Sequence, residues 1–445
     1  MKLNAKLDVD VLALQQDDEV TCLLTFEAPV PADVADRPGE TLIVVVDRSG
    51  SMQGEPLDAV RSSLHALLDR VKPQDIFGVV TFDNTATVAV PARPIRDHHV
   101  PTVHSLIEGI QSGGSTDLSG GYLLGLSEAR RNLGATGATV LMLSDGHANA
   151  GITDPNQVGG LATRAHDERI TSSTIGIGSG YDETLLNEVA TCGSGSHRFA
   201  YTPDDASAVV SEEAGDLLSK AIINAFVRIK PTDSALLDGI GTLHDVPRWI
   251  ETDCAGDKVL VIPLGDLYAG EERELLVHFA VPAVADLGHH QLAEFTIDYV
   301  TLPDLASQTI TWPMAVNVVP GDEASGRVPD PTVTTARLLA ETTRAKKEAT
   351  EALGHGDTDT AARLMTVQSG LLGAALIAIS DDLPAATELR SRLGEEQEQL
   401  DKLARGAREQ DAFRSRKSFM EDVAMESRGR NDTIRRNRSR GKRDF

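Results

Sequence analysis

The chain has 445 residues, 41% of them hydrophobic and 4% aromatic, so it is too long for one ordinary domain and can build two or three mainly aliphatic cores. Its net charge of −25 is uneven, because residues 413–445 carry 11 Lys and Arg against 5 Asp and Glu. An acidic body argues against nucleic acid as a partner. Three widely spaced cysteines, and an N-terminus without the apolar run of a signal peptide, predict a cytoplasmic protein without a disulfide framework.

Residues 1–33 contain two strand-like runs, 7–14 and 20–26, joined by a polar segment. The first run alternates apolar and acidic residues, which is the pattern of a half-exposed strand. We expect both runs to belong to a β-sandwich whose remaining strands come much later in the chain.

The stretch 41–52 is the centre of the next predicted domain. Its aliphatic residues 42–46 predict a strand buried on both faces, as in the middle of a parallel sheet. Asp47, Ser49 and Ser51 follow at alternate positions of a tight turn. One carboxylate and two hydroxyls can therefore converge on one point.

Residues 41–221 alternate between strand and helix patterns, which predicts a parallel sheet flanked by helices. Helices are expected over residues 56–71, 100–110 and 118–133, and strands over residues 76–82, 87–90, 139–145, 172–177 and 197–201.

Two later segments of this domain supply further oxygen atoms. Thr116 lies in a glycine-rich loop, residues 113–121, and Asp145 is the last residue of an apolar run that is followed by a glycine. The Asp-x-Ser-x-Ser motif, the loop threonine and the strand-terminal aspartate, in this order, resemble the metal-ion-dependent adhesion site of von Willebrand factor type A (VWA) domains. The element order of residues 41–221 is also similar to that of a VWA domain.

The resemblance implies that Asp47, Ser49, Ser51, Thr116 and Asp145 form one metal site. Five oxygen ligands without a nearby His or Cys favour a hard cation, with Mg²⁺ as the default and Mn²⁺ as a substitute. The two aspartates only just neutralise such an ion, which stays electrophilic. We expect an open position that takes an Asp or Glu side chain of a protein partner, and a vestigial site that holds no metal is the alternative.

Residues 224–319 change to short alternating runs at turn-rich spacing, which predicts an antiparallel β-sandwich. Five runs make an incomplete sandwich, so residues 1–33 are expected to complete it. The predicted fold class is therefore α/β: a doubly wound, mostly parallel sheet of the VWA type, inserted in an antiparallel β-sandwich and followed by a C-terminal helical bundle.

Residues 332–410 contain three helical patterns, at 334–353, 360–379 and 385–408. The most apolar stretch, residues 371–379, is too short to cross a bilayer, so no membrane span is expected. Residues 411–445 are expected to form a basic, disordered tail that docks on another protein or on the chain itself, regulated by phosphorylation at Ser418, Thr433 or Ser439.

The sequence favours a binding protein over an enzyme. No Gly-x-Ser-x-Gly signature accompanies the serines, and the glycine-rich loop lacks the lysine of a phosphate loop. Two alternatives stay open. The chain could recruit substrates to an ATPase chaperone of the AAA type, as some VWA proteins do, or it could be a metal-dependent hydrolase.

Overall fold

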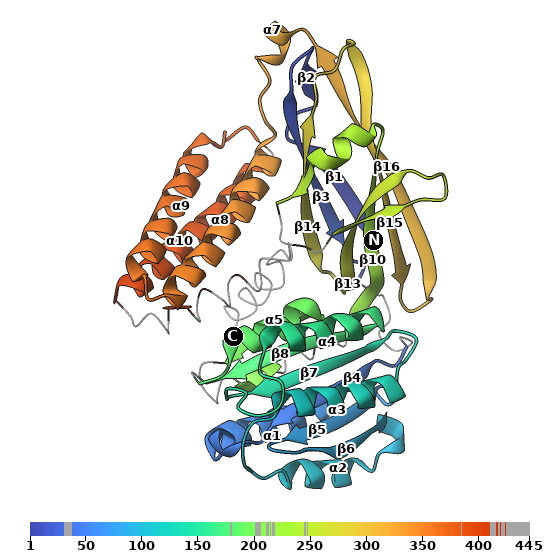
Figure 1. Ribbon diagram of the computed structural model, residues 1–445, viewed down its shortest axis with the longest axis vertical. Helices are drawn as coiled ribbons and strands as arrows, with labels where there is room; N and C mark the ends of the chain where they lie inside the picture. The colour runs from blue at the N-terminus through green and yellow to red at the C-terminus, as the bar shows by residue number, and fades with distance from the viewer. Residues whose placement is uncertain are drawn as a thin grey trace. The chain divides into compact units, whose positions relative to one another are not determined.

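The computed structural model shows an α/β domain inserted into an antiparallel β-sandwich, and three long helices follow the sandwich in the chain (Figure 1). It describes residues 1–30, 38–178, 180–200, 206–210, 219–243, 248–383 and 385–409, together with residues 213, 215, 246, 415, 416, 419 and 423. The chain divides into two compact units, Pro31–Lys220 and the combination of Met1–Val30 with Ala221–Phe445. The predicted fold class is confirmed.

The sheet of the inserted unit has the strand order β6-β5-β4-β7-β8-β9. Its strands are β4 (Thr41–Asp47), β5 (Ile76–Phe82), β6 (Ala86–Pro94), β7 (Ala138–Ser144), β8 (Ile170–Ile177) and β9 (Ser194–Ala200). Only β6 runs antiparallel to its neighbour, β5. Every residue of β4 is buried, as its continuous aliphatic run predicts for a central parallel strand.

The helices of this unit include α1 (Glu55–Leu68), α2 (Val100–Glu108), α3 (Leu118–Arg131), α4 (Pro155–Asp167) and α5 (Glu183–Cys192). Buried side chains of α3, α4 and α5 pack in one core with Ile43 and Val45 of β4. The sequence analysis did not predict α4, because Gly159 and Gly160 interrupt its apolar pattern. Asp154 caps this helix by accepting from Asn156 N, and Pro155 begins it.

The sandwich contains two sheets, one with the order β1-β3-β14-β11 and one with the order β12-β13-β10-β15-β16-β2. Its strands are β1 (Lys2–Leu7), β2 (Val11–Ala13), β3 (Asp18–Glu27), β10 (Lys220–Pro231), β11 (Ile240–Thr242), β12 (Trp249–Thr252), β13 (Lys258–Tyr268), β14 (Glu272–Val281), β15 (Gly288–Thr301) and β16 (Ala306–Val319). Because β3 pairs with β14 and β2 pairs with β16, strands from both sides of the insertion share one core.

The prediction of one strand over residues 7–14 was wrong. Leu7 ends β1 in one sheet, and Val11 begins β2 in the other sheet. Between them the Asp8 side chain accepts hydrogen bonds from the backbone N–H groups of Val9 and Thr21, both at 2.8 Å, which turns the chain. The short strands β11 and β12 were not predicted either, since four residues or fewer show no periodicity.

The C-terminal helices are α7 (Gly321–Ala324), α8 (Pro331–Gly354), α9 (Thr358–Ala378) and α10 (Ala386–Glu409). The last three pack around a shared apolar core and lie side by side in Figure 1. Val333, Ala336 and Ala340 of α8 also pack on Leu23 of β3 and Leu276 of β14. The bundle is therefore anchored on the four-stranded sheet.

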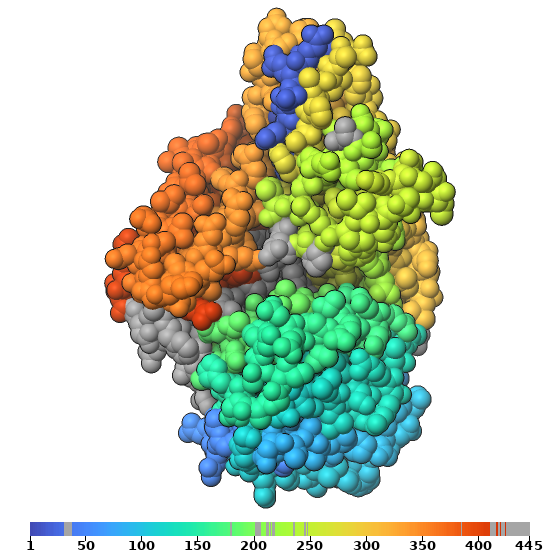
Figure 2. All heavy atoms as spheres, in the orientation of Figure 1, coloured from blue at the N-terminus to red at the C-terminus, as the bar shows by residue number. Residues whose placement is uncertain are grey.

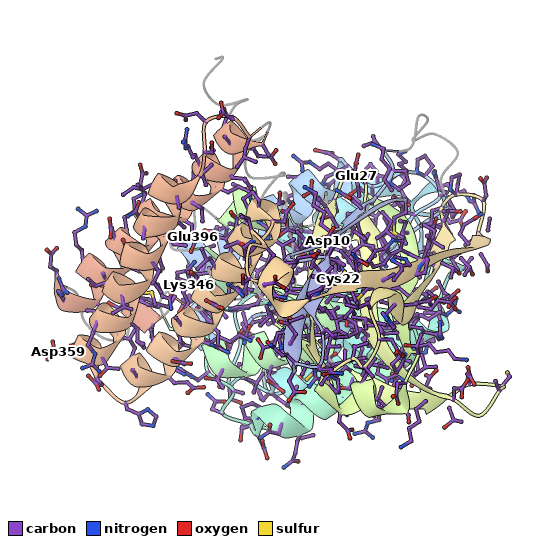
Figure 3. All side chains as sticks on the ribbon, turned by 90° about the horizontal axis from the view of Figure 1, so that it is seen from above. Asp10, Cys22, Glu27, Lys346, Asp359 and Glu396 are labelled. Carbon is purple, nitrogen blue, oxygen red and sulfur yellow. The ribbon has the colours of Figure 1, made fainter. Side chains whose placement is uncertain are left out.

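A buried ion pair lies inside this bundle. The Lys346 side chain is fully buried, and its Nζ atom lies 2.7 Å from Oε1 of Glu396. Figure 3 labels both residues on neighbouring helices, α8 and α10. A buried charge needs such a partner, so the pair disfavours other registers of the two helices.

Helix α9 is long and apolar enough to cross a membrane by length and composition, although residues 371–379 alone are not. Only 28% of its most apolar 18-residue stretch is buried, and the side chains of Val367, Leu371 and Ile377 are exposed. The surface of α8 and α9 is in view in Figure 2, as orange atoms. The buried side of α9 packs against α8 and α10 through Ala361, Met365 and Leu372. Because α9 is buried on one side and apolar and exposed on the other, the expected absence of a membrane span stays a prediction.

The proposed basic tail, residues 411–445, lies outside the described residues except for 415, 416, 419 and 423. The same holds for the suggested phosphorylation sites.

Candidate functional site

Two neighbouring parallel strands end at the edge of the sheet where the candidate site lies. β4 ends at Asp47, and β7 ends at Ser144, one residue before Asp145. In the sheet, β4 lies between β5 and β7. The strands that follow β4 in the chain are first added on the β5 side and then, from β7 onward, on the opposite side, so the direction of strand order reverses at β4. Ligand sites of open α/β sheets lie outside the carboxyl ends of strands at such a reversal.

The Asp47 carboxylate is completely buried and held at both oxygen atoms. Its Oδ1 accepts from the backbone N–H of Ser49 at 2.8 Å, and its Oδ2 accepts from Oγ of Ser144 at 2.6 Å. Ser144 comes next after the paired residues Val46 and Leu143 in the β4–β7 ladder. Strand pairing therefore fixes the orientation of the carboxylate.

The two serines of the motif connect this turn to the end of β7. Oγ of Ser49 lies 3.1 Å from Oγ of Ser51. Ser51 Oγ in turn donates to Oδ1 of Asp145 at 2.8 Å. Three side chains from two strand ends thus form one hydrogen-bonded group.

Gly146 shows where the remaining oxygen atoms converge. A Cβ atom on this glycine would lie 3.3 Å from Ser51 Oγ and 3.5 Å from Thr116 Oγ1. The same atom would lie 3.8 Å from Oδ2 of Asp47. Oxygen atoms from the end of β4, from the turn after it and from the loop of Thr116 therefore surround one small space, which the missing side chain of Gly146 leaves open.

The glycine-rich loop that carries Thr116 is held by backbone contacts. Gly113 N donates to the carbonyl oxygen of Arg48 at 2.6 Å, and Thr116 N donates to Oδ1 of Asn149 at 2.8 Å. Asn149 N returns a bond to the Thr116 carbonyl at 3.1 Å. A Cβ on Gly113 would lie 2.0 Å from Oδ2 of Asp83, so only glycine allows this close approach.

Both candidate acidic ligands hold their protons more tightly than free aspartate. Burial raises the pKa of Asp47, although hydrogen bonds from Ser144 and Ser49 oppose the rise. Burial also raises the pKa of Asp145 from 3.8 to about 6, with the bond from Ser51 opposing and the charge of Asp47 adding to the rise. Two carboxylates thus share a poorly hydrated site, which costs free energy when both are ionised.

The residues present fit a divalent cation. Two carboxylates and hydroxyl oxygens converge, and a positive ion among them would relieve the repulsion between Asp47 and Asp145. No group of three or more His, Cys, Asp or Glu side chains in the described part of the chain could hold a metal ion. Binding at this site would therefore depend on the hydroxyls of Ser49, Ser51 and Thr116.

Sequence reasoning missed three residues that support the site. Ser144 and Asn149 hold Asp47 and the Thr116 loop, as described above. Asp83 follows β5 directly and pairs with the guanidinium of Arg48, Nη2 to Oδ2 at 2.9 Å. The signal that could have revealed Asp83 and Ser144 is that both are polar residues at the carboxyl ends of buried strands.

Other polar residues near this edge have ordinary structural roles. Asp117 caps α3 by accepting from Gly120 N at 2.9 Å. His147 is exposed, and its Nδ1 lies 3.7 Å from Oδ2 of Asp182. His98 and His99 lie at the start of α2, where His99 bonds to Thr102.

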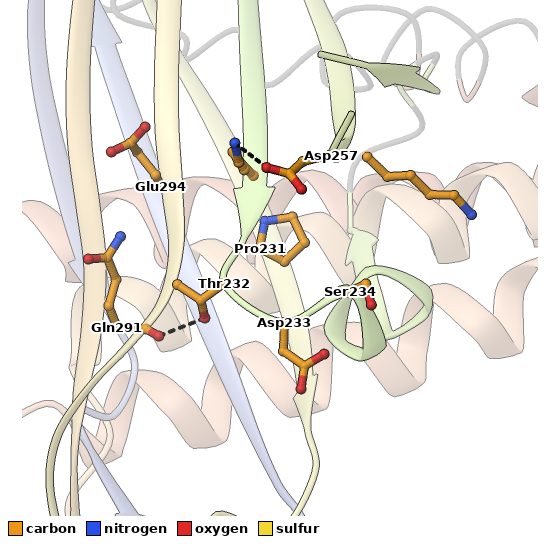
Figure 4. Close-up of a pocket in the computed structure, with 9 residues that line it drawn as sticks. Pro231, Thr232, Asp233, Ser234, Asp257, Gln291 and Glu294 are labelled. Carbon is orange, nitrogen blue, oxygen red and sulfur yellow. Dashed lines mark hydrogen bonds and ion pairs between the residues drawn. The ribbon is translucent and has the colours of Figure 1, made fainter. Parts of the chain in front are cut away.

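The sandwich carries a separate polar pocket (Figure 4). Lys230 lies there with its Nζ 2.8 Å from Asp253 Oδ2 and 2.7 Å from Asp257 Oδ2. Thr232 Oγ1 donates to the Gln291 carbonyl at 2.8 Å. Lys230 and Thr232 therefore already have hydrogen-bond partners within the sandwich.

Comparison with known proteins identifies the inserted domain. Residues 41–213 match the sequence profile of the von Willebrand factor type A domain, so the chain contains a VWA domain. Two solved structures share the fold of nearly the whole chain, each at 16% identity. "von Willebrand factor type A from Catenulispora acidiphila" has a TM-score of 0.69 and covers 91% of this chain and 89% of its own. The ArnB paralog VWA2 from Sulfolobus acidocaldarius has a TM-score of 0.63 and covers 96% and 98%.

Curated relatives share part of the sequence. An uncharacterized protein of Synechocystis sp. is 26% identical over 260 residues, which are 58% of this chain and 61% of that protein. YfbK of Escherichia coli, also uncharacterized, is 29% identical over 184 residues, 41% of this chain and 32% of that protein. The E3 ubiquitin-protein ligase WAV3 of Arabidopsis thaliana is 25% identical over 357 residues, 77% of this chain and 44% of that protein. The chain spans only about a third to three fifths of these relatives.

Proposed function

We propose that the VWA domain binds a protein partner in a metal-dependent manner, by accepting an Asp or Glu side chain of the partner at the carboxyl edge of its sheet. Domains of this family are typically metal-dependent adhesion or protein-interaction modules. The observation that carries the proposal is the convergence of Asp47, Ser51 and Thr116 around the space beside Gly146, with Asp145 bonded to Ser51.

Each residue has a distinct part in this proposal. Asp47 and Asp145 would hold Mg²⁺, or Mn²⁺ in its place, together with the hydroxyls of Ser49, Ser51 and Thr116. Oxygen atoms of this kind are the ligands that hard cations prefer. When bound, such an ion supplies an electrophilic position for a carboxylate of the partner.

The neighbours of these five residues hold them in place before any ion binds. Ser144 and the backbone of Ser49 orient Asp47, and Asn149 anchors the loop of Thr116. A site arranged in advance loses little side-chain entropy on binding, which favours affinity.

The test is isothermal titration calorimetry with Mg²⁺ and with Mn²⁺. Asp145→Asn should weaken binding roughly tenfold or more, because it removes one of two charged ligands. Gly146→Ala should weaken binding as well, since its methyl group would fill the space between the oxygen atoms. The matched control is Gly160→Ala in α4, where a Cβ atom meets nothing within 4 Å.

Thermal unfolding in chelator separates lost binding from lost folding. Asp145→Asn relieves a charge repulsion, so its midpoint should equal or exceed that of the wild-type chain. A pull-down from native lysate with and without chelator then tests the partner. Wild-type protein that binds no divalent ion, or a partner retained equally in chelator and by Asp145→Asn, would overturn the proposal.

We also propose that the protein acts by binding rather than catalysis, and in the cytoplasm. The location is supported by the three cysteines, which are all free thiols: Cys22 is buried, Cys192 is half-buried and Cys254 is exposed. An exposed free thiol is typical of a reducing compartment. Fractionation of the cells that make the protein tests the location.

A further inference from the structure

Arg48 is a basic residue inside the acidic motif, and its side chain has a defined partner. It lies between Asp47 and Ser49, and its Nη2 atom is 2.9 Å from Oδ2 of Asp83. The arginine side chain is 26% exposed and that of Asp83 is 9% exposed, so the pair is largely withdrawn from water. Charges in such surroundings are screened much less than charges at the surface.

Asp83 is a third carboxylate at the same edge of the sheet. β4 and β5 are paired with Asp47 opposite Phe82, so Asp83 is the next residue after the partner of Asp47. Neighbouring strands lie about 4.8 Å apart. Asp83 Oδ1 accepts from the backbone N–H of Thr85 at 2.9 Å, which fixes the side chain. The negative charge of Asp83 therefore belongs to the electrostatics of the candidate metal site.

Two further aspartates near this edge have positive partners of another kind. Asp117 caps α3 and Asp182 caps α5, each by accepting from backbone N–H groups of the helix. The partial positive charge of a helix N-terminus offsets such a carboxylate. Asp47, Asp145 and Asp83 remain, with a joint charge of −3 when all three are ionised.

We propose that Arg48 sets the charge of the loaded site by neutralising Asp83, so that a bound divalent ion is balanced by Asp47 and Asp145 alone. With Arg48 present, three carboxylates, one guanidinium and one divalent ion sum to zero. A partner carboxylate can then approach without net repulsion. Without Arg48 the loaded site would carry −1, which favours the metal ion and repels an acidic ligand. This inference rests on the proposed metal-dependent binding.

A purely structural role for Arg48 predicts the opposite result for the metal. The Arg48 carbonyl accepts from Gly113 N, and a Cβ on Gly113 would collide with Asp83. If the ion pair served mainly to position the loop of Thr116, loss of the side chain would misplace a ligand and weaken metal binding. The sign of the change in metal affinity therefore distinguishes the two roles.

The experiment is calorimetric titration of the full chain with Mg²⁺ alone. Arg48→Gln should bind Mg²⁺ roughly fivefold more tightly than the wild-type chain, since it removes a positive charge close to a doubly charged ion. Asp83→Asn should bind it more weakly, and the double variant should return to the wild-type affinity. Arg48→Lys is the matched control. Lysine keeps the positive charge and can make a single contact with one oxygen atom of Asp83, as Arg48 does. The Mg²⁺ affinity of Arg48→Lys should therefore equal that of the wild-type chain.

A second measurement follows the acidic ligand. At saturating Mg²⁺, a fluorescent decaglutamate peptide should bind the wild-type chain and Arg48→Lys equally, and Arg48→Gln more weakly. Weaker Mg²⁺ binding by Arg48→Gln than by the wild-type chain, with a thermal midpoint near the wild-type value, would overturn the charge role. A wild-type chain that binds no Mg²⁺ would instead overturn the proposed function, so the two failures are distinguishable.

Discussion

Asp145 is the residue at which pH and cation binding meet. Its carboxylate accepts from Ser51, but it is partly buried and near the charge of Asp47. The protonated form therefore persists to a higher pH than in a free aspartate, and below about pH 6 a divalent ion must displace that proton in order to bind. The hydroxyls of the motif hold the two acids in place without neutralising them.

The affinity for Mg²⁺ should consequently depend on pH. The pKa of Asp145 is raised to about 6, mainly by burial, so measured affinity should rise from pH 5 to pH 7 and level off above that range. The stability of the metal-free fold should instead decrease as pH rises. Because the folded state keeps this proton and the unfolded state loses it near pH 4, stability contributed by the protonated side chain is lost as pH rises from about 4 to about 6.

Calorimetric titrations at pH 5, 6 and 7 measure the first effect, and thermal midpoints in chelator measure the second. Asp145→Asn is the control, since it cannot titrate and should remove this part of the pH dependence of the midpoint. An Mg²⁺ affinity that is the same at pH 5 and pH 7 would contradict the assignment.

At the scale of elements, helix α3 positions the site because it begins directly after the loop of Thr116 and packs closely on β4. Gly125 makes this close packing possible. A Cβ atom there would lie 2.4 Å from Cγ2 of Val45, a distance that real contacts do not reach. The helix axis therefore cannot accept even a methyl group at this position without moving away from the strand.

Gly125→Ala should destabilise the VWA domain although alanine is the better helix former. Overpacking costs about 1 to 3 kcal/mol, and the gain in helix propensity is only about 1 kcal/mol. The thermal midpoint of the full chain should fall, whereas Gly160→Ala in the interior of α4 should leave it unchanged or raise it. A midpoint for Gly125→Ala at or above that of Gly160→Ala would contradict the close packing.

At the scale of the molecule, a buried ion pair joins the helical bundle to the sandwich. Arg392 of α10 makes two parallel bonds to Glu274 of β14, Nη1 to Oε1 and Nη2 to Oε2, both at 2.9 Å. Each side chain is only 9% exposed. Removing one partner of such a pair leaves a buried charge unpaired, which is far more costly than losing a surface pair.

Arg392→Ala should therefore lower the free energy of unfolding of the sandwich and bundle by about 3 kcal/mol. Arg390→Ala is the control in the same helix. Its partner Asp381 is 86% exposed, and Arg390 also donates to the Ile379 carbonyl, so the loss should be smaller, about 1 kcal/mol. Denaturant titrations followed by the fluorescence of Trp249 and Trp312 measure the free energy of unfolding of both variants. Equal losses in the two variants would show that the buried pair does not stabilise the contact.

The sequence by itself determined the central strand and the motif that follows it, because both are local properties. Five aliphatic residues in β4 predict burial on both faces, and alternate spacing places Asp47, Ser49 and Ser51 in one turn. Only the tertiary structure decided which distant residues join them. Ser144 lies beside Asp47, and Asp83 beside Arg48, through strand pairing across many residues. The division of residues 7–14 between two sheets has the same origin, since pairing partners far along the chain override a local pattern.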